Sequence, residues 1–306
     1  MSIYLITGGA GFIGSHIADA LIQKGEQVRI LDNLSSGSAH NLRHLHDQAE
    51  FIQGDICNLD TVRNAMRGTD YVLHHAAIVS VAKSVVDPIS THLVTAGGTL
   101  NVLLAARDLN VKRVVCASSA AVYGDNTHLP LRETERPTPL SPYAAAKLVS
   151  EHYASVFTHA YGVPTVCLRY FNVYGARQDA ASEYAGVIAK FIALARAGQP
   201  PTIFGDGAQT RDFVHVSDVV QANLLACHTN RAVGCAINIA TGQSVSLLQL
   251  WQIIQQHFQM DQSPVFGSAR PGDIRHSSAS IELAQQVLGY QPQTRLQDGL
   301  FALTQQ

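Results

Sequence analysis

The stretch IYLITGGAGFIG, residues 3–14, decides the fold of this chain. An apolar run is followed by glycines at 8, 11 and 14, and then by an amphipathic stretch that ends near Gly25. The order of strand, glycine turn and helix is typical of a dinucleotide-binding unit. The glycines allow close approach to a pyrophosphate, and the helix N-terminus faces its charge. The sequence therefore predicts a nucleotide site at the first turn.

Further apolar runs alternate with helical stretches along the first half of the chain. We expect strands at 27–32, 50–55, 71–77, 112–119 and 164–172, and helices at 59–67, 85–109 and 142–161. Strand–helix–strand alternation indicates a parallel sheet with helices on both faces. The predicted class is α/β, with a Rossmann-type doubly wound parallel sheet.

The composition changes after Asn172, where Gly, Pro and Gln become more frequent. We expect residues 1–172 to form an NAD-binding domain that also receives residues 213–240, where a helix and a buried strand are predicted. Residues 173–306 are then expected to form a smaller, interwoven C-terminal lobe that binds the substrate. No repeat or charged tail interrupts this organisation.

Bulk composition limits the partners of the chain. It has 306 residues and a net charge of −2, so no basic excess predicts nucleic-acid binding. The five cysteines form no C-x-x-C pair, which argues against a disulfide framework or a metal site. The apolar N-terminus is expected to be a strand, and no stretch is expected to reach the roughly 20 apolar residues of a membrane span. We expect a cytoplasmic protein.

Asp32 ends the second predicted strand and bears on the choice of cofactor. A carboxylate there would bond the ribose hydroxyls of NAD and repel the 2′-phosphate of NADP. Asp55 ends the third strand and could face the adenine, although both residues could instead be ordinary turn formers. The remaining positions expected at the NAD site are Gly8, Gly11, Phe12, Ile13, Gly14, Asn33, Ser36, Gly37, Ile56, Ala76, Ala77, Tyr143, Lys147 and Tyr170.

The segment TPLSPYAAAK, residues 138–147, predicts a helix start that carries a reactive pair. Ser141 suits the N-cap and Pro142 the first helical position, so Tyr143 and Lys147 share one helix face. A free tyrosine has a pKa of about 10, so a phenolate base at pH 7 needs positive charge nearby. The ammonium and the nicotinamide ring would supply it. A surface pair on an alanine-rich helix is the alternative.

These motifs together resemble the extended short-chain dehydrogenase/reductase superfamily, and within it the UDP-hexose 4-epimerases. The resemblance covers almost the whole chain and includes SSAAVYG (118–124), LRYFNVYG (168–175), FGDGAQTRDFVHVSD (204–218) and RPGDIRHS (270–277). It implies 4-epimerisation of a UDP-hexose through a transient 4-keto sugar. In this group Tyr143 would be the catalytic acid/base and Lys147 would bind the nicotinamide ribose and lower the tyrosine pKa. Ser119 would bond the sugar O4.

The resemblance also implies the substrate contacts and the assembly. Asn172, Arg211, Arg270 and Asp273 would hold UDP. Guanidinium forks suit a buried diphosphate, with surface salt bridges as the alternative. Helices 85–109 and 142–161 would form the four-helix interface of a homodimer.

Ala120 and Ala121 limit which of the family's reactions the chain is expected to catalyse. In the family's 4,6-dehydratases an Asp-Glu pair follows the catalytic Ser or Thr. Its nucleotide-glucuronate decarboxylases and GDP-mannose dehydratases carry a Glu at the second place. With alanines there, deprotonation at C5 lacks an agent, and the ketone can only be reduced again. The alternative is that these alanines are filler and that another segment supplies the acid.

Ser277 bears on the choice of sugar. By the resemblance, the residue at this place lies near the C2 substituent, and a small side chain leaves room for an acetamide. We therefore expect UDP-glucose/UDP-galactose as substrates, with UDP-GlcNAc/UDP-GalNAc also accepted. A UDP-glucuronate 4-epimerase, a nucleotide-sugar dehydratase or decarboxylase, a net oxidoreductase and a non-catalytic NAD-binding module remain alternatives. Three positions depart from the family pattern, Thr95 (usually Asn), Val79 (Lys in some epimerases) and Ser280 (frequently Asp).

Overall fold

A seven-stranded parallel sheet forms the centre of the molecule. The computed structural model describes residues 1–45, 47–178, 186–269 and 274–305. All neighbouring strands of this sheet run parallel. Their order is β10 (Ala236–Ile239), β6 (Thr165–Tyr170), β5 (Arg113–Ser119), β4 (Tyr71–His74), β1 (Ile3–Thr7), β2 (Gln27–Asp32) and β3 (Ala49–Gln53). The predicted α/β class with a doubly wound parallel sheet is confirmed.

Helices cover both faces of the sheet and bury its apolar side chains. On one face lie α1 (Phe12–Gln23), α8 (Val216–His228) and α10 (Glu282–Leu288). On the other lie α2 (Leu59–Met66), α5 (Gly98–Asp108) and α6 (Pro142–Tyr161). Each face has its own buried cluster, so the strands contribute apolar residues to both sides, as expected for a covered parallel sheet.

The prediction of one continuous helix at 85–109 is wrong, because the chain forms several shorter elements there. The chain forms α3 (Val81–Val86), α4 (Pro88–His92), the π-helical turn η2 (Leu93–Gly97) and then α5. Asp87 ends α3 and caps α4, because its carboxylate accepts a hydrogen bond from Ser90 N at 3.0 Å while Pro88 takes the first helical position. A cap and a proline start a new helix here.

Residues Pro88–Asp108 also correct the expectation about apolar length. By length and composition this run could cross a membrane, although half of its most apolar stretch is buried inside the protein. The run packs against α2 and α6, which is the behaviour of a core helix. Its apolar character therefore reflects burial between two other helices.

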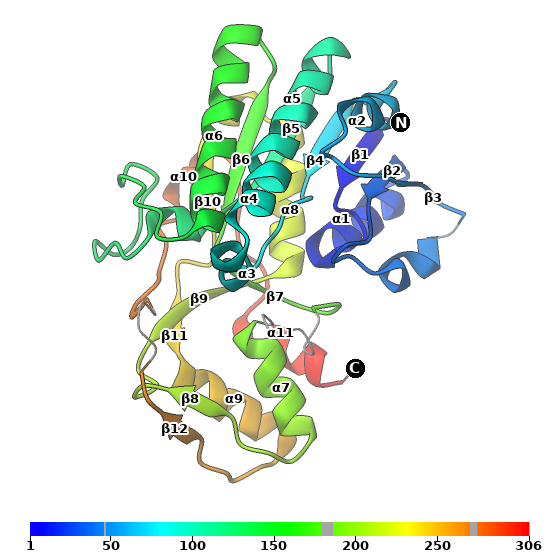
Figure 1. Ribbon diagram of the computed structural model, residues 1–306. Helices are drawn as coiled ribbons and strands as arrows, with labels where there is room; N and C mark the ends of the chain where they lie inside the picture. Colours follow the sequence, from blue (N-terminus) through cyan, green and yellow to red (C-terminus); the bar gives the residue numbers. More distant parts are fainter. Residues whose placement is uncertain (46, 179–185, 270–273, 306) are drawn as a thin grey trace.

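A smaller lobe lies below the sheet in Figure 1. It contains a three-stranded sheet ordered β11 (Ser244–Ser246), β9 (Thr210–His215) and β7 (Asn172–Tyr174), and a pair formed by β8 (Thr202–Phe204) and β12 (Val265–Gly267). The helices α7 (Val187–Arg196), α9 (Leu247–Phe258) and α11 (Leu296–Thr304) pack around Trp251. The short turns η1 (Ala39–Leu45), η3 (Ala120–Tyr123) and η4 (Asn230–Ala232) complete the described elements.

The chain passes between the lobes more than once. It leaves the large sheet after β6, builds β7 to β9, and returns as α8 and β10, which pairs with β6. It then leaves again for β11 and α9 and returns as α10. The two lobes are thus interwoven, and β9 runs directly into α8, which packs on the large sheet.

Arg113 ties the end of α8 to the sheet. Its side chain is buried at the start of β5, and its guanidinium donates to Ala226 O at 3.0 Å and Thr229 O at 2.6 Å. It also donates to Asn230 Oδ1 at 2.9 Å. Three acceptors at the C-terminus of α8 are therefore satisfied by one side chain.

We expect Arg113→Met to destabilise the protein without changing its chemistry. Loss of the three hydrogen bonds leaves buried acceptors unsatisfied, at a cost of about 2 kcal/mol, or a fall of several degrees in the thermal midpoint. Differential scanning calorimetry measures this fall. Arg132→Met is the control, because it removes an exposed ion pair to Glu282 and should shift the midpoint little. Equal midpoints for the Arg113 variant and the parent would contradict this account.

Candidate active site

The predicted site residues collect at one edge of the large sheet. All its strands are parallel, so the turns that follow β1, β2, β4 and β5 lie along the same edge. The chain leaves β1 towards one face and β4 towards the other, which makes the gap between them a topological switch point. Ligands of doubly wound sheets bind at such a point.

The turn after β1 has no room for side chains. Gly8 has φ 71°, and a Cβ there would lie 2.6 Å from Ala76 N, in the segment after β4. A Cβ on Gly14 would lie 2.4 Å from Gly8 O. The turn thus brings two strand ends into backbone contact, as the glycine spacing predicts.

The N-terminus of α1 is left without a side-chain cap. Gly11 is its N-cap residue, and the first turn, which begins with Phe12 and Ile13, has no acidic residue. The free N–H groups of a helix start attract phosphate. Together with the glycine turn, they fit the diphosphate of a dinucleotide.

Asp32, at the end of β2, lies beside this turn. Its buried carboxylate accepts hydrogen bonds from Ala10 N at 3.0 Å and from Leu34 N at 2.8 Å. Each carboxylate oxygen has a second lone pair, so both remain able to accept from ribose hydroxyls. The following loop runs beside the glycine turn, because a Cβ on Gly37 would lie 2.9 Å from Ala10. Ser36 is exposed on this loop.

Asp55 lies beside Asp32 at the end of β3. It accepts from Asn33 Nδ2 at 3.0 Å and from Cys57 N at 2.8 Å, and the backbone hydrogen bond is the main cause that holds its pKa below the usual range. Ile56, the next residue, is buried against Gly98. Asn33 and Asp55 thus form a polar rim, and Ile56 lies behind it.

The helix α6 begins as predicted and presents the reactive side chains. Ser141 Oγ accepts from Ala144 N at 3.2 Å, and Pro142 takes the first helical position. Tyr143 and Lys147 are buried, and Tyr143 shares a hydrogen bond with Ser119 at the end of β5. Lys147 Nζ donates to Ala117 O at 2.8 Å. The structure therefore brings Ser119, Tyr143 and Lys147 together.

The electrostatics of the protein chain differ from the expectation for Tyr143. Burial raises the pKa of the Tyr143 phenol, and the hydrogen bond with Ser119 opposes this rise. Burial lowers the pKa of Lys147 to about 8, although nearby thiols and Glu151 act in the opposite direction. The predicted lowering of the tyrosine pKa by Lys147 is thus not found in the protein alone, because desolvation dominates both groups.

Ser119 also begins the turn η3. Its Oγ accepts from Ala121 N at 3.2 Å, so Ala120 and Ala121 directly follow the hydroxyl at the sheet edge. Both alanines are half-buried, whereas Val122 and Tyr123 behind them are fully enclosed. The two positions next to Ser119 therefore carry no acid or base.

The smaller lobe places the substrate-binding candidates along β7 and β9. Asn172 Nδ2 donates to Asp212 O at 3.2 Å, and a cavity of about 100 Å³ lies against Asn172, Val187 and Phe213. Arg211 is on β9, and Ser277 N donates to Thr210 O at 3.1 Å on the same strand. Arg270 and Asp273 lie outside the described residues.

The side chain of Tyr170 lies in the core. Its ring stacks on His75, and its hydroxyl donates to Asn223 Oδ1 at 3.0 Å. The side chain of Tyr170 therefore packs in the core, and the expected place of this residue at the cofactor site, at the end of β6, stays a prediction.

Thr95 and Ser280, two of the three positions that depart from the family pattern, make hydrogen bonds in the structure. Thr95 is buried, and its hydroxyl accepts from Ile78 N at 3.3 Å, which steadies the segment after β4. Val79 is exposed, with 65% of its surface accessible, on the same segment. Ser280 is buried, and its Oγ accepts from Glu282 N at 3.4 Å at the start of α10.

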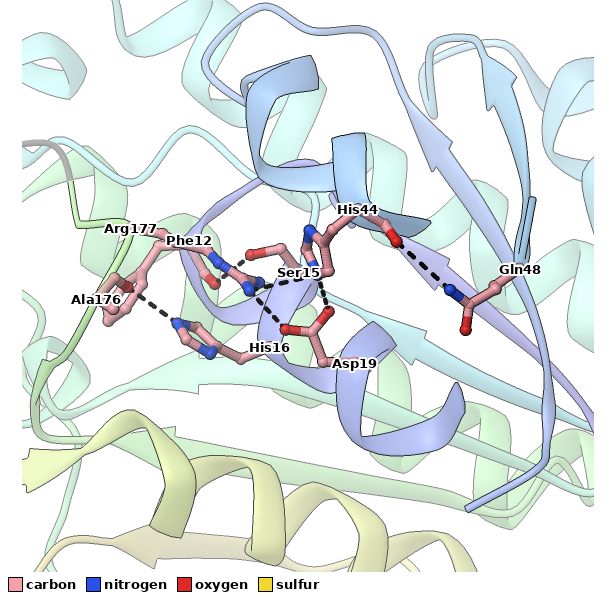
Figure 2. A network of polar contacts seen from close by, with 8 residues as sticks. All are labelled: Phe12, Ser15, His16, Asp19, His44, Gln48, Ala176 and Arg177. Carbon is pink, nitrogen blue, oxygen red and sulfur yellow. Dashed lines mark hydrogen bonds and ion pairs between the residues drawn. The ribbon is translucent and has the colours of Figure 1, made fainter. Parts of the chain in front are cut away.

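A polar network joins α1 to the segment after β7, as Figure 2 shows. Asp19 accepts from Arg177 at 2.6 Å and pairs with His44 Nε2 at 2.7 Å. His16 Nε2 lies 2.9 Å from Ala176 O, and burial lowers its pKa. This network links the nucleotide-binding helix with the chain that enters the smaller lobe.

Comparisons with known proteins agree with this geometry. Residues 4–240 match the model of the NAD dependent epimerase/dehydratase family. A putative UDP-glucose 4-epimerase of Methanocaldococcus jannaschii is 40% identical over 298 residues, which is 97% of this chain and 95% of that protein.

Solved structures give the same result. UDP-glucose 4-epimerase of Thermotoga maritima, bound to UDP-glucose, has a TM-score of 0.94 at 38% identity, over 99% of this chain and 97% of that one. UDP-N-acetylglucosamine 4-epimerase of Methanobrevibacter ruminantium, in complex with UDP-N-acetylmuramic acid, has a TM-score of 0.94 at 39% identity, over 100% and 99%.

The fold agrees with these comparisons. The predictions of the superfamily and of NAD are confirmed. The chain belongs to the NAD-dependent epimerase/dehydratase family, in which it is a nucleotide-sugar 4-epimerase.

Proposed function

We propose that this epimerase interconverts UDP-glucose and UDP-galactose and that it also accepts UDP-GlcNAc and UDP-GalNAc. The observation that carries the proposal is the Ser119–Tyr143–Lys147 cluster at the sheet edge, next to two alanines instead of acids. The relatives that bind UDP-glucose and UDP-N-acetylmuramic acid support a pocket that tolerates different sugar substituents.

Tyr143 is the proposed acid and base at the sugar O4. As a phenolate it takes the O4 proton in the first half of the reaction, and as the resulting phenol it returns the proton in the second, while Ser119 holds the same oxygen. NAD, when bound, supplies the hydride acceptor and donor for the sugar C4. Since burial raises the pKa of Tyr143, positive charge must accompany its ionisation. Lys147, already buried on the same helix face, is the side chain placed to contribute it.

Substrate retention is assigned to the smaller lobe. Arg211, on β9, and Arg270 would hold the diphosphate, with Asn172 and Asp273 at the nucleotide. Buried Asp212 fixes β9 here, because its carboxylate accepts from Thr241 N at 2.9 Å and Gly242 N at 2.9 Å. Anchoring at the diphosphate leaves the sugar free to turn its opposite face to the same catalytic groups.

Replacing Tyr143 tests the assignment of the acid and base. We expect Tyr143→Phe to lower kcat by at least about 100-fold, since general acid–base catalysis contributes that much, while bound NAD is retained. A coupled assay measures kcat, and the absorbance of cofactor released on denaturation measures retention. Tyr153→Phe, on the same helix, is the matched control and should keep its turnover. Near-normal turnover by the Tyr143 variant would end the assignment.

Replacing Ser277 tests the choice of sugar. Ser277 is buried next to β9, and a tyrosine there would occupy the space proposed for the acetamide. We expect Ser277→Tyr to lower kcat/KM for UDP-GlcNAc by roughly 100-fold and to spare UDP-glucose. His276→Tyr, at an exposed neighbouring position, is the control.

Proton NMR of the anomeric signals follows each sugar separately. Equal losses on both substrate pairs would contradict a gate at Ser277. Turnover of UDP-glucuronate with none of UDP-glucose would replace the proposed substrate by the glucuronate alternative.

We also propose a homodimer, formed through α3, α4 and α6. These helices pack on one another and expose an apolar surface. Its members are between 48% and 84% exposed, and they are Val81, Val85, Val86, Ile89, Leu93 and Val156. A second copy of the same surface would bury these side chains from water.

Light scattering tests the assembly. The parent protein should have the mass of a dimer at micromolar concentration, and the double variant Val85→Asp/Ile89→Asp should have the mass of a monomer, because it places charges in an apolar interface. Phe266→Asp is the control, since this residue is equally apolar and 55% exposed but lies on β12 of the smaller lobe. A monomeric parent protein would rule out this interface.

A further inference from the structure

A buried ion pair lies directly behind the catalytic residues. Arg169 Nε donates to Glu151 Oε1 at 2.9 Å, and a second guanidinium N–H donates to Glu151 Oε2 at 2.7 Å. The side chains are only 6% and 7% exposed. Glu151 lies on the same face of α6 as Tyr143 and Lys147, and Arg169 lies on β6 beside the end of β5. The pair therefore touches both elements that carry the catalytic groups.

The pair holds the chain on both sides of Ser119. Ser118 Oγ donates to the Glu151 carboxylate on the strand side. On the other side, Arg169 donates to Tyr123 Oη at 2.8 Å, and its guanidinium lies 4.9 Å from the centre of the Tyr123 ring. Tyr123 in turn donates to Asn238 Oδ1 at 2.7 Å. Ser119 is thus fixed between two residues that the same ion pair binds.

The pair also determines which partner Lys147 has. Glu151 follows Lys147 by one helical turn, a spacing at which opposite charges pair readily. Both carboxylate oxygens of Glu151 are instead engaged, by Arg169 and Ser118. Lys147 Nζ donates to a backbone carbonyl and feels Glu151 only as a neighbouring charge. Without Arg169, the carboxylate would compete for the ammonium.

The stability of the fold alone does not explain why the chain buries this ion pair. Desolvation of two charges offsets much of their attraction, and well-packed apolar residues of similar volume are often as stable. The contacts of the pair with Ser118 and Tyr123 point instead to the alignment of the catalytic groups. We propose that Glu151 and Arg169 are positioning residues of this centre, which fix Ser119 and keep Lys147 free for the cofactor and the substrate. This inference rests on the epimerase function proposed above.

The experiment compares the parent protein with the singles Glu151→Gln and Arg169→Met and the apolar double Glu151→Leu/Arg169→Met. All three variants should lose kcat by about 10- to 100-fold, as expected for displaced catalytic groups, with little change in KM. The double variant should recover the thermal midpoint that the singles lose, but not kcat. Arg113→Met is the matched control, because it removes a buried arginine from the other end of β5 and should lower only the midpoint.

The pH dependence of kcat gives a second readout. Lys147 acts as an ammonium, so activity is lost as pH rises through its pKa. Glu151 raises this pKa, so Glu151→Gln should move the alkaline limb to lower pH. Arg169→Met leaves the carboxylate unshared and removes a cation, so it should move the limb to higher pH. The titratable or charged groups around Lys147 are Tyr143 and Glu151 on α6, His74 and His75 at β4, Cys116 on β5, and Cys167 and Arg169 on β6.

The outcomes separate this inference from the proposed function. The parent protein alone shows which UDP-sugar is epimerised, and the variants are then compared on that sugar. A double variant with parental kcat, or single variants whose alkaline limbs move in the same direction or not at all, would overturn the positioning role. Opposite shifts together with low kcat in the stable double variant would support it.

Discussion

The close approach of two backbone turns is the constraint on which the site depends. The turn after β1 and the segment after β4 touch where a Cβ on Gly8 would lie 2.6 Å from Ala76 N. Any side chain there would push the strands apart or displace the turn. Because Gly8 has no side chain, the two segments can stay in contact. The start of α1, which has no side-chain cap, then lies beside Asp32. The place available to the dinucleotide at the sheet edge follows from this contact.

In the proposed function the two lobes divide the tasks of substrate binding and chemistry, and several chain connections join them. β9 carries Arg211 and runs directly into α8, which packs on the face of the large sheet. Asn172 likewise begins β7 immediately after β6. The residues proposed to hold the substrate are therefore only a few residues of chain away from elements of the large sheet. A sugar anchored by its diphosphate is presented to Tyr143 by rigid elements and not by a flexible linker.

Much of this arrangement was predictable from local patterns. The first strand, the start of α6 at Pro142 and the grouping of Ser119, Tyr143 and Lys147 follow from periodicity, caps and motifs. The helix break at Asp87 was missed because an apolar periodic run continues through it. The sequence nevertheless contains the signals for a new helix, Asp87 as a cap and Pro88 as the first helical residue. The side chain of Tyr170 and the pair of Glu151 with Arg169 depend on partners from distant segments, which spacing along the chain does not reveal. The sign of the Tyr143 pKa shift depends on burial, which only the packed structure supplies.

The late return of β10 to the large sheet has a consequence for biosynthesis. This strand is the outermost partner of β6, yet it is made some sixty residues after that strand, once β7, α7, β8 and β9 of the smaller lobe have been synthesised. Until then the backbone edge of β6 has no neighbour on that side, and an open edge can pair with other chains. Completion of the large sheet is thus coupled to synthesis of the first part of the smaller lobe, and a nascent chain arrested before Ile239 would carry an unprotected, aggregation-prone edge.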